Sequence, residues 1–235
     1  MTYEEEIQLE SLVWKKKLVR RKGMVERFSK NAQSKMNRLI PQKAHNIITD
    51  SIKQMVEWTM TSTKYLSKSS YNTNLTLLER EKLIQEKLQA YKRTAALEGA
   101  GTGAGGIFLG LADFPLLLGI KMRYLFDVGK IYGFPTSEES ERLFLLHVFQ
   151  LAFSREEQKE ELVEVIEAWD TNVKVRSIEW QTWQQDYRDY IDLIKMLQLV
   201  PGVGAVVGAV ANYHLLDHLG ETAIQCYRLR MFYKG

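Results

Sequence analysis

The sequence lacks features that mark several classes of protein. It contains one cysteine, Cys226, so it can form no intramolecular disulfide and has no cysteine cluster for zinc. It has four prolines, and no alternating apolar run is bounded by turn residues, so strands are not expected. Neither a G-x-x-x-x-G-K-[ST] nucleotide-binding motif nor an apolar N-terminal core with a cleavage site is present. These absences exclude disulfide scaffolds and P-loop ATPases, and they favour a reducing cytoplasm.

What is present is a chain of globular composition with an uneven distribution of charge. Its 235 residues are 45% hydrophobic and 26% charged, and a mean hydropathy of −0.27 is too polar for a multi-span membrane protein. Residues 1–64 hold 13 Lys or Arg against 7 Asp or Glu, whereas residues 136–195 hold 7 against 14. A basic region of this kind approaches either an anionic surface or an acidic face of a protein.

Apolar residues recur at helical spacing almost throughout the chain. This pattern predicts an all-α, single-domain helical bundle, with basic amphipathic helices in residues 1–68 and a helical core in residues 69–235. Polar residues 69–74 resemble a linker between these parts. Thr136 with Glu139, and Ser154 with Glu157, match capping boxes and predict two helix starts.

Thirteen of the fifteen glycines fall within residues 99–133 and 202–220. Residues 99–120 contain one charged side chain and residues 196–216 contain none, and each segment is long enough to cross a bilayer. Small residues four apart allow two helices to approach closely, so the two glycine-rich helices are expected to pack together at the centre of the bundle. A buried hairpin in a soluble bundle and insertion into a membrane both remain open. The glycines expected at the contact are Gly101, Gly105, Gly106, Gly110, Gly204 and Gly208.

Asp113 stands alone in apolar surroundings. If it is buried, it must be protonated, hydrogen-bonded or paired. Asn212, in the second glycine-rich segment, is a candidate partner, so Asp113 and Asn212 are expected to form a polar tie between the segments. A role in handling protons or ions is the alternative.

The segment HLLDHLGE contains the clearest signal for an enzyme. His214, Asp217, His218 and Glu221 share one helical face, and the first five residues resemble an inverted zinc-protease motif with Asp in place of Glu. The simpler interpretation is the polar face of an amphipathic helix, because Gln225 and Arg228 continue the stripe. We therefore expect no metal site and no cofactor, and His214, His218 and Glu221 are the metal ligands of the alternative.

The segment KKKLVRRK contains six basic residues in eight and follows an amphipathic helical pattern. Such a helix suits an interfacial anchor, with its apolar side in the headgroups and its basic side chains on anionic lipid. A solvated face or a protein partner is the alternative. Nucleic acid is not expected, because no stacking aromatic array accompanies the charge. The expected membrane or partner contacts are Trp14, Lys15, Lys16, Lys17, Arg20, Arg21 and Lys22.

Three segments of the chain, residues 110–134, 143–153 and 200–232, resemble the EcsC family of bacterial proteins, which is named for the third product of an operon that also encodes an ABC transporter. The resemblance covers about the whole chain, and Asp113, Asn212 and the glycines follow the recurring pattern of the family. It implies an α-helical, cytoplasmic or membrane-associated protein linked to the transporter and to protein secretion. It carries no catalytic residues to this chain.

Together these observations predict a non-enzymatic accessory protein of a bacterial ABC transporter. We expect it at the cytoplasmic face of the membrane, peripherally associated, with transporter subunits or an anionic membrane surface as its partners. The alternative is a soluble metal-dependent hydrolase that uses the H-x-x-D-H stripe.

Overall fold

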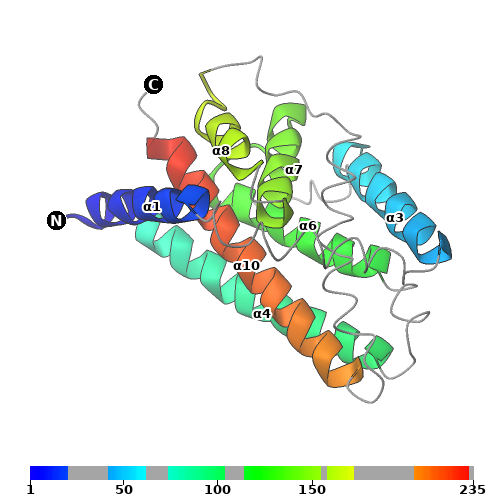
Figure 1. Cartoon of the computed structure of the whole chain (residues 1–235). Coiled ribbons are helices and arrows are strands. Elements are labelled where there is room, and N and C mark those ends of the chain that lie inside the picture. The colour runs from blue at the N-terminus through cyan, green and yellow to red at the C-terminus, as the bar shows by residue number, and fades with distance from the viewer. Residues whose placement is uncertain (21–41, 62–73, 104–113, 155–157, 172–203, 233–235) are drawn as a thin grey trace.

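The structure is a computed structural model that describes residues 1–20, 42–61, 74–103, 114–154, 158–171 and 204–232 (Figure 1). The described residues form seven packed helices and no strand, so the predicted all-α class is confirmed. The helices are α1 (Tyr3–Arg20), α3 (Gln42–Thr61), α4 (Leu77–Gly103), α6 (Phe114–Tyr132), α7 (Glu139–Phe153), α8 (Lys159–Glu167) and α10 (Gly204–Phe232).

The two longest helices, α4 and α10, lie side by side and run antiparallel (Figure 1). Contacts along the pair keep one register. Glu81 on α4 meets Arg228 on α10, and Lys92, eleven residues further along α4, meets Asp217, eleven residues back along α10. The glycine-rich end of α4 and the glycine-rich start of α10 therefore lie at the same end of the pair.

The C-terminal half of α10 is the centre of the bundle. It is buried on every side from Thr222 to Arg230, and α10 packs against α1, α4, α6, α7 and α8. α3 packs against α6 and α7. Helices from the basic N-terminal region thus contact the same core as the rest of the described chain, and the predicted boundary near residue 69 lies outside the described residues.

Two described helices begin with capping boxes that the sequence analysis did not identify. The Thr2 hydroxyl accepts a hydrogen bond from the Glu5 amide while the Glu5 carboxylate accepts one from the Thr2 amide, and Thr76 with Glu79 caps α4 in the same way. The box predicted at Thr136 is wrong. α7 does begin at Glu139, but its N-cap residue is Glu138, which makes no side-chain cap, and Thr136 is buried instead. The helix start predicted at Ser154 is also wrong, because Ser154 is the C-cap residue of α7 and α8 begins at Lys159 with Gln158 as its N-cap residue. Glu157 lies outside the described residues.

Two glycines in the described helices occupy positions where a methyl group would collide with a neighbour. A Cβ at Gly220 of α10 would lie 2.6 Å and 2.7 Å from the two terminal methyl carbons of Leu88 on α4, and one at Gly129 of α6 would lie 2.7 Å from the Tyr227 hydroxyl oxygen. The helices α4 and α10 therefore approach each other closely at Gly220. Of the six glycines expected at the helix contact, Gly101, Gly204 and Gly208 lie within α4 and α10, while Gly105, Gly106 and Gly110 lie outside the described residues.

Candidate functional site

The first helix, α1, has an inward face of few apolar residues. Ile7 and Ser11 are buried, and the half-buried Trp14 and Leu18 pack against the main core. These positions recur at three and four residues, as expected for one helical face. Two fully buried side chains are few for an 18-residue helix, so polar contacts contribute much of its attachment.

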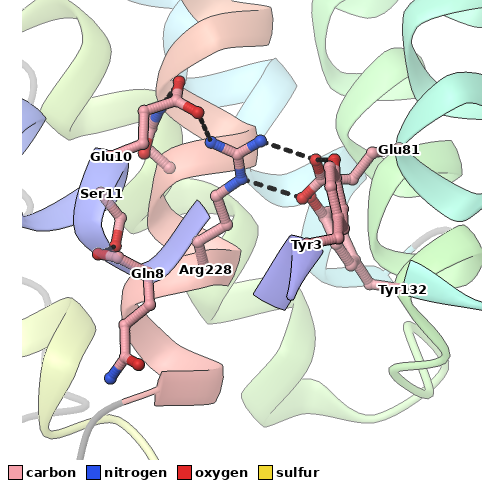
Figure 2. A network of polar contacts seen from close by, with 8 residues as sticks. Tyr3, Gln8, Glu10, Ser11, Glu81, Tyr132 and Arg228 are labelled. Atoms are coloured by element: carbon pink, nitrogen blue, oxygen red, sulfur yellow. Dashed lines mark hydrogen bonds and ion pairs between the residues drawn. The ribbon is translucent and has the colours of Figure 1, made fainter. Parts of the chain in front are cut away.

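The strongest of these contacts is a cluster on Arg228, formed by Tyr3, Glu10, Glu81, Tyr132 and Arg228 (Figure 2). The Arg228 guanidinium donates two hydrogen bonds to the Glu81 carboxylate, at 2.9 Å and 2.6 Å, and makes an ion pair of 3.0 Å with Glu10. Tyr3 and Tyr132 each donate a hydroxyl hydrogen bond to Glu81, at 2.5 Å and 3.1 Å. The Arg228 cluster joins α1, α4, α6 and α10.

Burial and hydrogen bonding act in opposite directions on the carboxylate at the centre of this cluster. Burial acts to raise the pKa of Glu81, but the hydrogen bonds from Arg228, Tyr3 and Tyr132 outweigh it and hold the pKa below its usual range. Burial, together with the Glu81 carboxylate, raises the pKa of Tyr3 to about 12. The cluster therefore stays fully charged at neutral pH, and Tyr3 stays a hydrogen-bond donor. An ion pair of this kind fixes geometry, because both charged groups are engaged with each other.

Two further contacts complete the attachment of α1. The Lys15 ammonium lies 2.7 Å from both carboxylate oxygens of Glu167 at the end of α8. The Gln225 amide of α10 donates a hydrogen bond to Glu10 at 3.3 Å. Because the contacts reach α4, α8 and α10 from different turns of α1, they fix the rotation of the helix about its axis.

With its rotation fixed, α1 presents a second face outward. Leu9, Leu12 and Val13 are 56%, 44% and 58% exposed. The basic residues that follow them, Lys16, Lys17 and Arg20, are also exposed. The structure thus divides the contacts predicted from the basic run: Trp14 and Lys15 make internal contacts, Lys16, Lys17 and Arg20 face outward, and Arg21 and Lys22 lie outside the described residues.

The H-x-x-D-H stripe on α10 is split between several environments. His218 directs its Nε2 atom to the carbonyl oxygen of Ala152 on α7, at 2.9 Å, and Asp217 pairs with Lys92 of α4. His214 and Glu221 are exposed. Within the described residues, no three His, Cys, Asp or Glu side chains are grouped closely enough to hold a metal ion.

The simpler interpretation of that stripe needs a correction. The sequence pattern predicts that Gln225 and Arg228 continue the polar face of an amphipathic helix, but they are 4% and 7% exposed. The expectation fails because α10 is surrounded by other helices on all sides over this half. Arg228 and Gln225 therefore meet Glu81 and Glu10 inside the protein rather than solvent. The polar tie predicted between Asp113 and Asn212 stays a prediction, since Asn212 is buried and Asp113 lies outside the described residues.

Several buried charged groups were not identified from the sequence. On α7 and α10, Arg230 pairs with Glu141 at 2.7 Å and with Asp170, which follows α8, at 2.7 Å. Lys121 points into the core from the buried face of α6, 2% exposed and with no hydrogen-bond or ionic partner among the described residues. Burial lowers the pKa of Lys121 to about 8.

One signal in the sequence could have revealed the polar contacts of α4. Charged residues interrupt its buried stripe, whose spacing of three and four is otherwise apolar: Glu81, Ile84, Leu88, Lys92 and Ala95. A charge on an apolar face calls for a partner of opposite charge, and α10 supplies one for each.

The described helices include none that is apolar over a long enough stretch to cross a membrane. The described residues include residues 99–103 and 114–120 of the first glycine-rich segment and residues 204–216 of the second, and they do not include residues 104–113 and 196–203.

Comparison with known proteins finds similarity over nearly the whole chain. The EcsC protein family matches residues 5–232. Protein EcsC of Bacillus subtilis is 49% identical over 231 residues, which cover 98% of this chain and 97% of that protein. An uncharacterized protein of the same organism, YdbA, is 28% identical over 141 residues, 58% of this chain and 52% of its own length. No solved structure shows significant similarity to the chain. By the extent of the family match and the identity over nearly the full length, the chain belongs to the EcsC protein family.

Proposed function

We propose that this protein is a non-enzymatic accessory protein of a bacterial ABC transporter, working at the cytoplasmic face of the membrane in secretion or peptide handling. The observation that carries the proposal is the match to the EcsC family across residues 5–232. The resemblance to that family implies a link to a transporter, and the match extends over nearly the whole chain.

The geometry of the described residues supports a binding role in a different way. Two buried arginines pair with buried glutamates in the core, Arg228 with Glu81 and Arg230 with Glu141. Such networks hold helices in place and have no free nucleophile or base. The feature that faces outward is the apolar and basic face of α1, and a face of that kind supports binding at a charged surface.

Capture from native membranes tests the proposal. The chain, tagged at its C-terminus and expressed at its natural level, should co-purify with both the ATPase and the membrane subunit of one transporter after gentle detergent extraction. A Lys53→Gln variant, altered at an exposed lysine of α3, serves as the control and should recover the same subunits. Recovery of the chain from membranes without any transporter subunit, before and after chemical cross-linking, would refute the accessory role.

A further inference from the structure

The outward face of α1 combines apolar and basic side chains in one stripe. Leu9, Leu12 and Val13 occupy its middle, and Lys16 and Arg20 continue it at helical spacings of four. All five are exposed. Three large apolar side chains close together on a surface helix, each about half exposed, form a contiguous apolar patch next to positive charge.

The contacts on the other side of α1 keep this stripe facing outward. Tyr3, Glu10 and Lys15 bind Glu81, Arg228 and Glu167 respectively. These three contacts come from the first, middle and later turns of the helix, so α1 can present its stripe without leaving the bundle. Binding through this face then has no cost of folding a helix, in contrast to a disordered basic segment.

The charges on α1 are separated along its axis. Glu4, Glu5 and Glu6 occupy the first turn, whereas Lys16, Lys17 and Arg20 occupy the last part. Glu6 and Lys16 are ten residues apart, about 15 Å along the axis. Since electrostatic screening at physiological ionic strength acts over about 8 Å, the acidic turn does not neutralise the basic end. Glu10, which is nearer, is paired with Arg228. The exposed C-terminal half of α1 is therefore positively charged and apolar.

We propose that this outward stripe of α1 docks on the surface of an anionic lipid bilayer, with the helix lying flat while its inward face stays on the bundle. The proposal rests on the proposed function and assigns the membrane contact within it. The positive charges of Lys16 and Arg20 favour a binding partner that is negatively charged. The stripe is a convex surface of long aliphatic and basic side chains, which fits the plane of the headgroups, where apolar groups enter the acyl boundary and basic groups stay at the phosphates.

Vesicle flotation with the full chain tests the proposal. Vesicles of phosphatidylcholine containing phosphatidylglycerol should bind the chain, and vesicles of phosphatidylcholine alone should bind it far more weakly. Replacing Lys16 and Arg20 by Gln should reduce the partition coefficient about 25-fold, because each basic residue at the surface contributes about five-fold. Replacing Leu9 and Val13 by Ser should also reduce it, by about ten-fold or more.

Matched control variants distinguish an effect of the α1 stripe from the effect of losing charge or an apolar side chain anywhere on the surface. A Lys53→Gln, Arg93→Gln variant loses the same charge from exposed positions on α3 and α4, and a Leu97→Ser variant loses an apolar side chain that is 74% exposed on α4. Both controls should bind vesicles as the parent chain does. Circular dichroism should show the same helix content in every variant, since all these side chains are exposed.

The inference fails if the α1 variants bind vesicles as tightly as the controls, or if phosphatidylcholine alone binds equally well. Loss of transporter capture in the α1 variants without any vesicle binding by the parent would also overturn it, and would show that the stripe meets an acidic protein surface. In that case the accessory role stands. Strong vesicle binding with no transporter subunit in the membrane capture has the opposite meaning: the docking surface is right and the proposed function is wrong.

Discussion

The two ends of the α4–α10 pair are built from opposite chemistry. At the end where α4 begins and α10 finishes, Glu81 and Arg228 form a buried ion pair. Tyr3 and Tyr132 donate further hydrogen bonds to Glu81, and Glu10 makes a second ion pair with Arg228. At the other end both helices are rich in glycine. A charge pair specifies which residue faces which, because a slip of one turn leaves two buried charges unmatched. Small residues permit close approach but do not specify register.

The difference predicts that substitutions at the two ends change stability by different amounts. Breaking the charged end has the largest expected effect. Replacing Arg228 by Met leaves Glu81 buried without its cation, which is expected to lower the free energy of unfolding by about 3 to 5 kcal/mol. Chemical denaturation at neutral pH measures this loss.

The pH dependence of the unfolding free energy of Arg228→Met tests whether the loss of stability comes from the unpaired Glu81 carboxylate. The Glu81 pKa is lowered in the folded parent, so its stabilising contribution is present above its ordinary value of 4.5 and is lost as pH falls through the lowered pKa. In the Arg228→Met variant Glu81 can protonate readily, so the gap between parent and variant should narrow in acid. The double variant Arg228→Met, Glu81→Leu is the control and should recover part of the loss. A loss that is independent of pH and unchanged in the double variant would contradict the ion-pair account.

Lys121 offers the reverse of this case, a buried charge with no partner among the described residues. Burial lowers its pKa from 10.5 to about 8, so charging it at neutral pH costs folding free energy. The folded chain binds fewer protons than the unfolded chain between pH 8 and 10.5, so stability should rise with pH across this window. Replacing Lys121 by Met should stabilise the protein at pH 7 by up to about 3 kcal/mol.

Denaturation of parent and variant at pH 7 and near pH 10.5 measures both effects. The variant should lose the rise in stability that the parent shows across this window. Lys53→Met, at an exposed position of α3, is the control and should change little. If Lys121→Met destabilises the protein at pH 7, the ammonium has a partner and the contrast with Arg228 does not hold.

The sequence predicts a helix well when one face of the helix is buried, and poorly when the helix is buried on all sides. α3 and α4 each bury one face, so their apolar residues keep a 3.6-residue period and their class could be predicted. The C-terminal half of α10 is buried on all sides, so its apolar residues do not follow the 3.6-residue period of a helix with one buried face. The sequence pattern therefore indicates the polar face of an amphipathic helix at Gln225 and Arg228, although both residues are buried. Pairing across α4 and α10 depends on register, which no local pattern contains.

The basic run on α1 shows the same limit at the candidate site. Sequence identified the helix and its charge, but six basic residues in eight surround the helix on all sides. Only the tertiary contact with Glu167 distinguishes Lys15 from Lys16. The capping boxes give a related lesson, since Thr76 with Glu79 begins a helix and Thr136 with Glu139 does not form a cap. In the second case Thr136 is buried, and its position in the fold overrides the local motif.

Between the two ends of the pair, Gly220 should respond with an intermediate effect. Alanine there places a methyl group within 2.7 Å of both Leu88 methyl carbons and 3.1 Å from the Tyr124 hydroxyl oxygen, so the buried Leu88 side chain must move within a packed core. The expected loss of stability is about 1 to 3 kcal/mol. Gly119 of α6 is a matched control, because nothing lies within 4 Å of its Cβ position. There alanine should stabilise, by up to about 1 kcal/mol through helix propensity. Thermal melts of the two variants should shift in opposite directions.

The smallest expected effect lies at the glycine-rich end, where its sign is the informative quantity. The register set by Lys92 and Asp217, continued nine residues along α4 and nine residues back along α10, brings Gly101 level with Gly208. If the helices stay close there, alanine at Gly208 should destabilise by about 1 kcal/mol, because the added methyl separates the backbones. If they diverge, the same change should stabilise as Gly119→Ala does, since only helix propensity then acts. The change in melting temperature of Gly208→Ala should be compared with the changes for Gly119→Ala and Gly220→Ala. Its sign shows whether Gly208 lies in open space, as Gly119 does, or at a close helix contact, as Gly220 does. We expect it to follow Gly220, and a higher melting temperature would mean that the contact between α4 and α10 ends before the glycines begin.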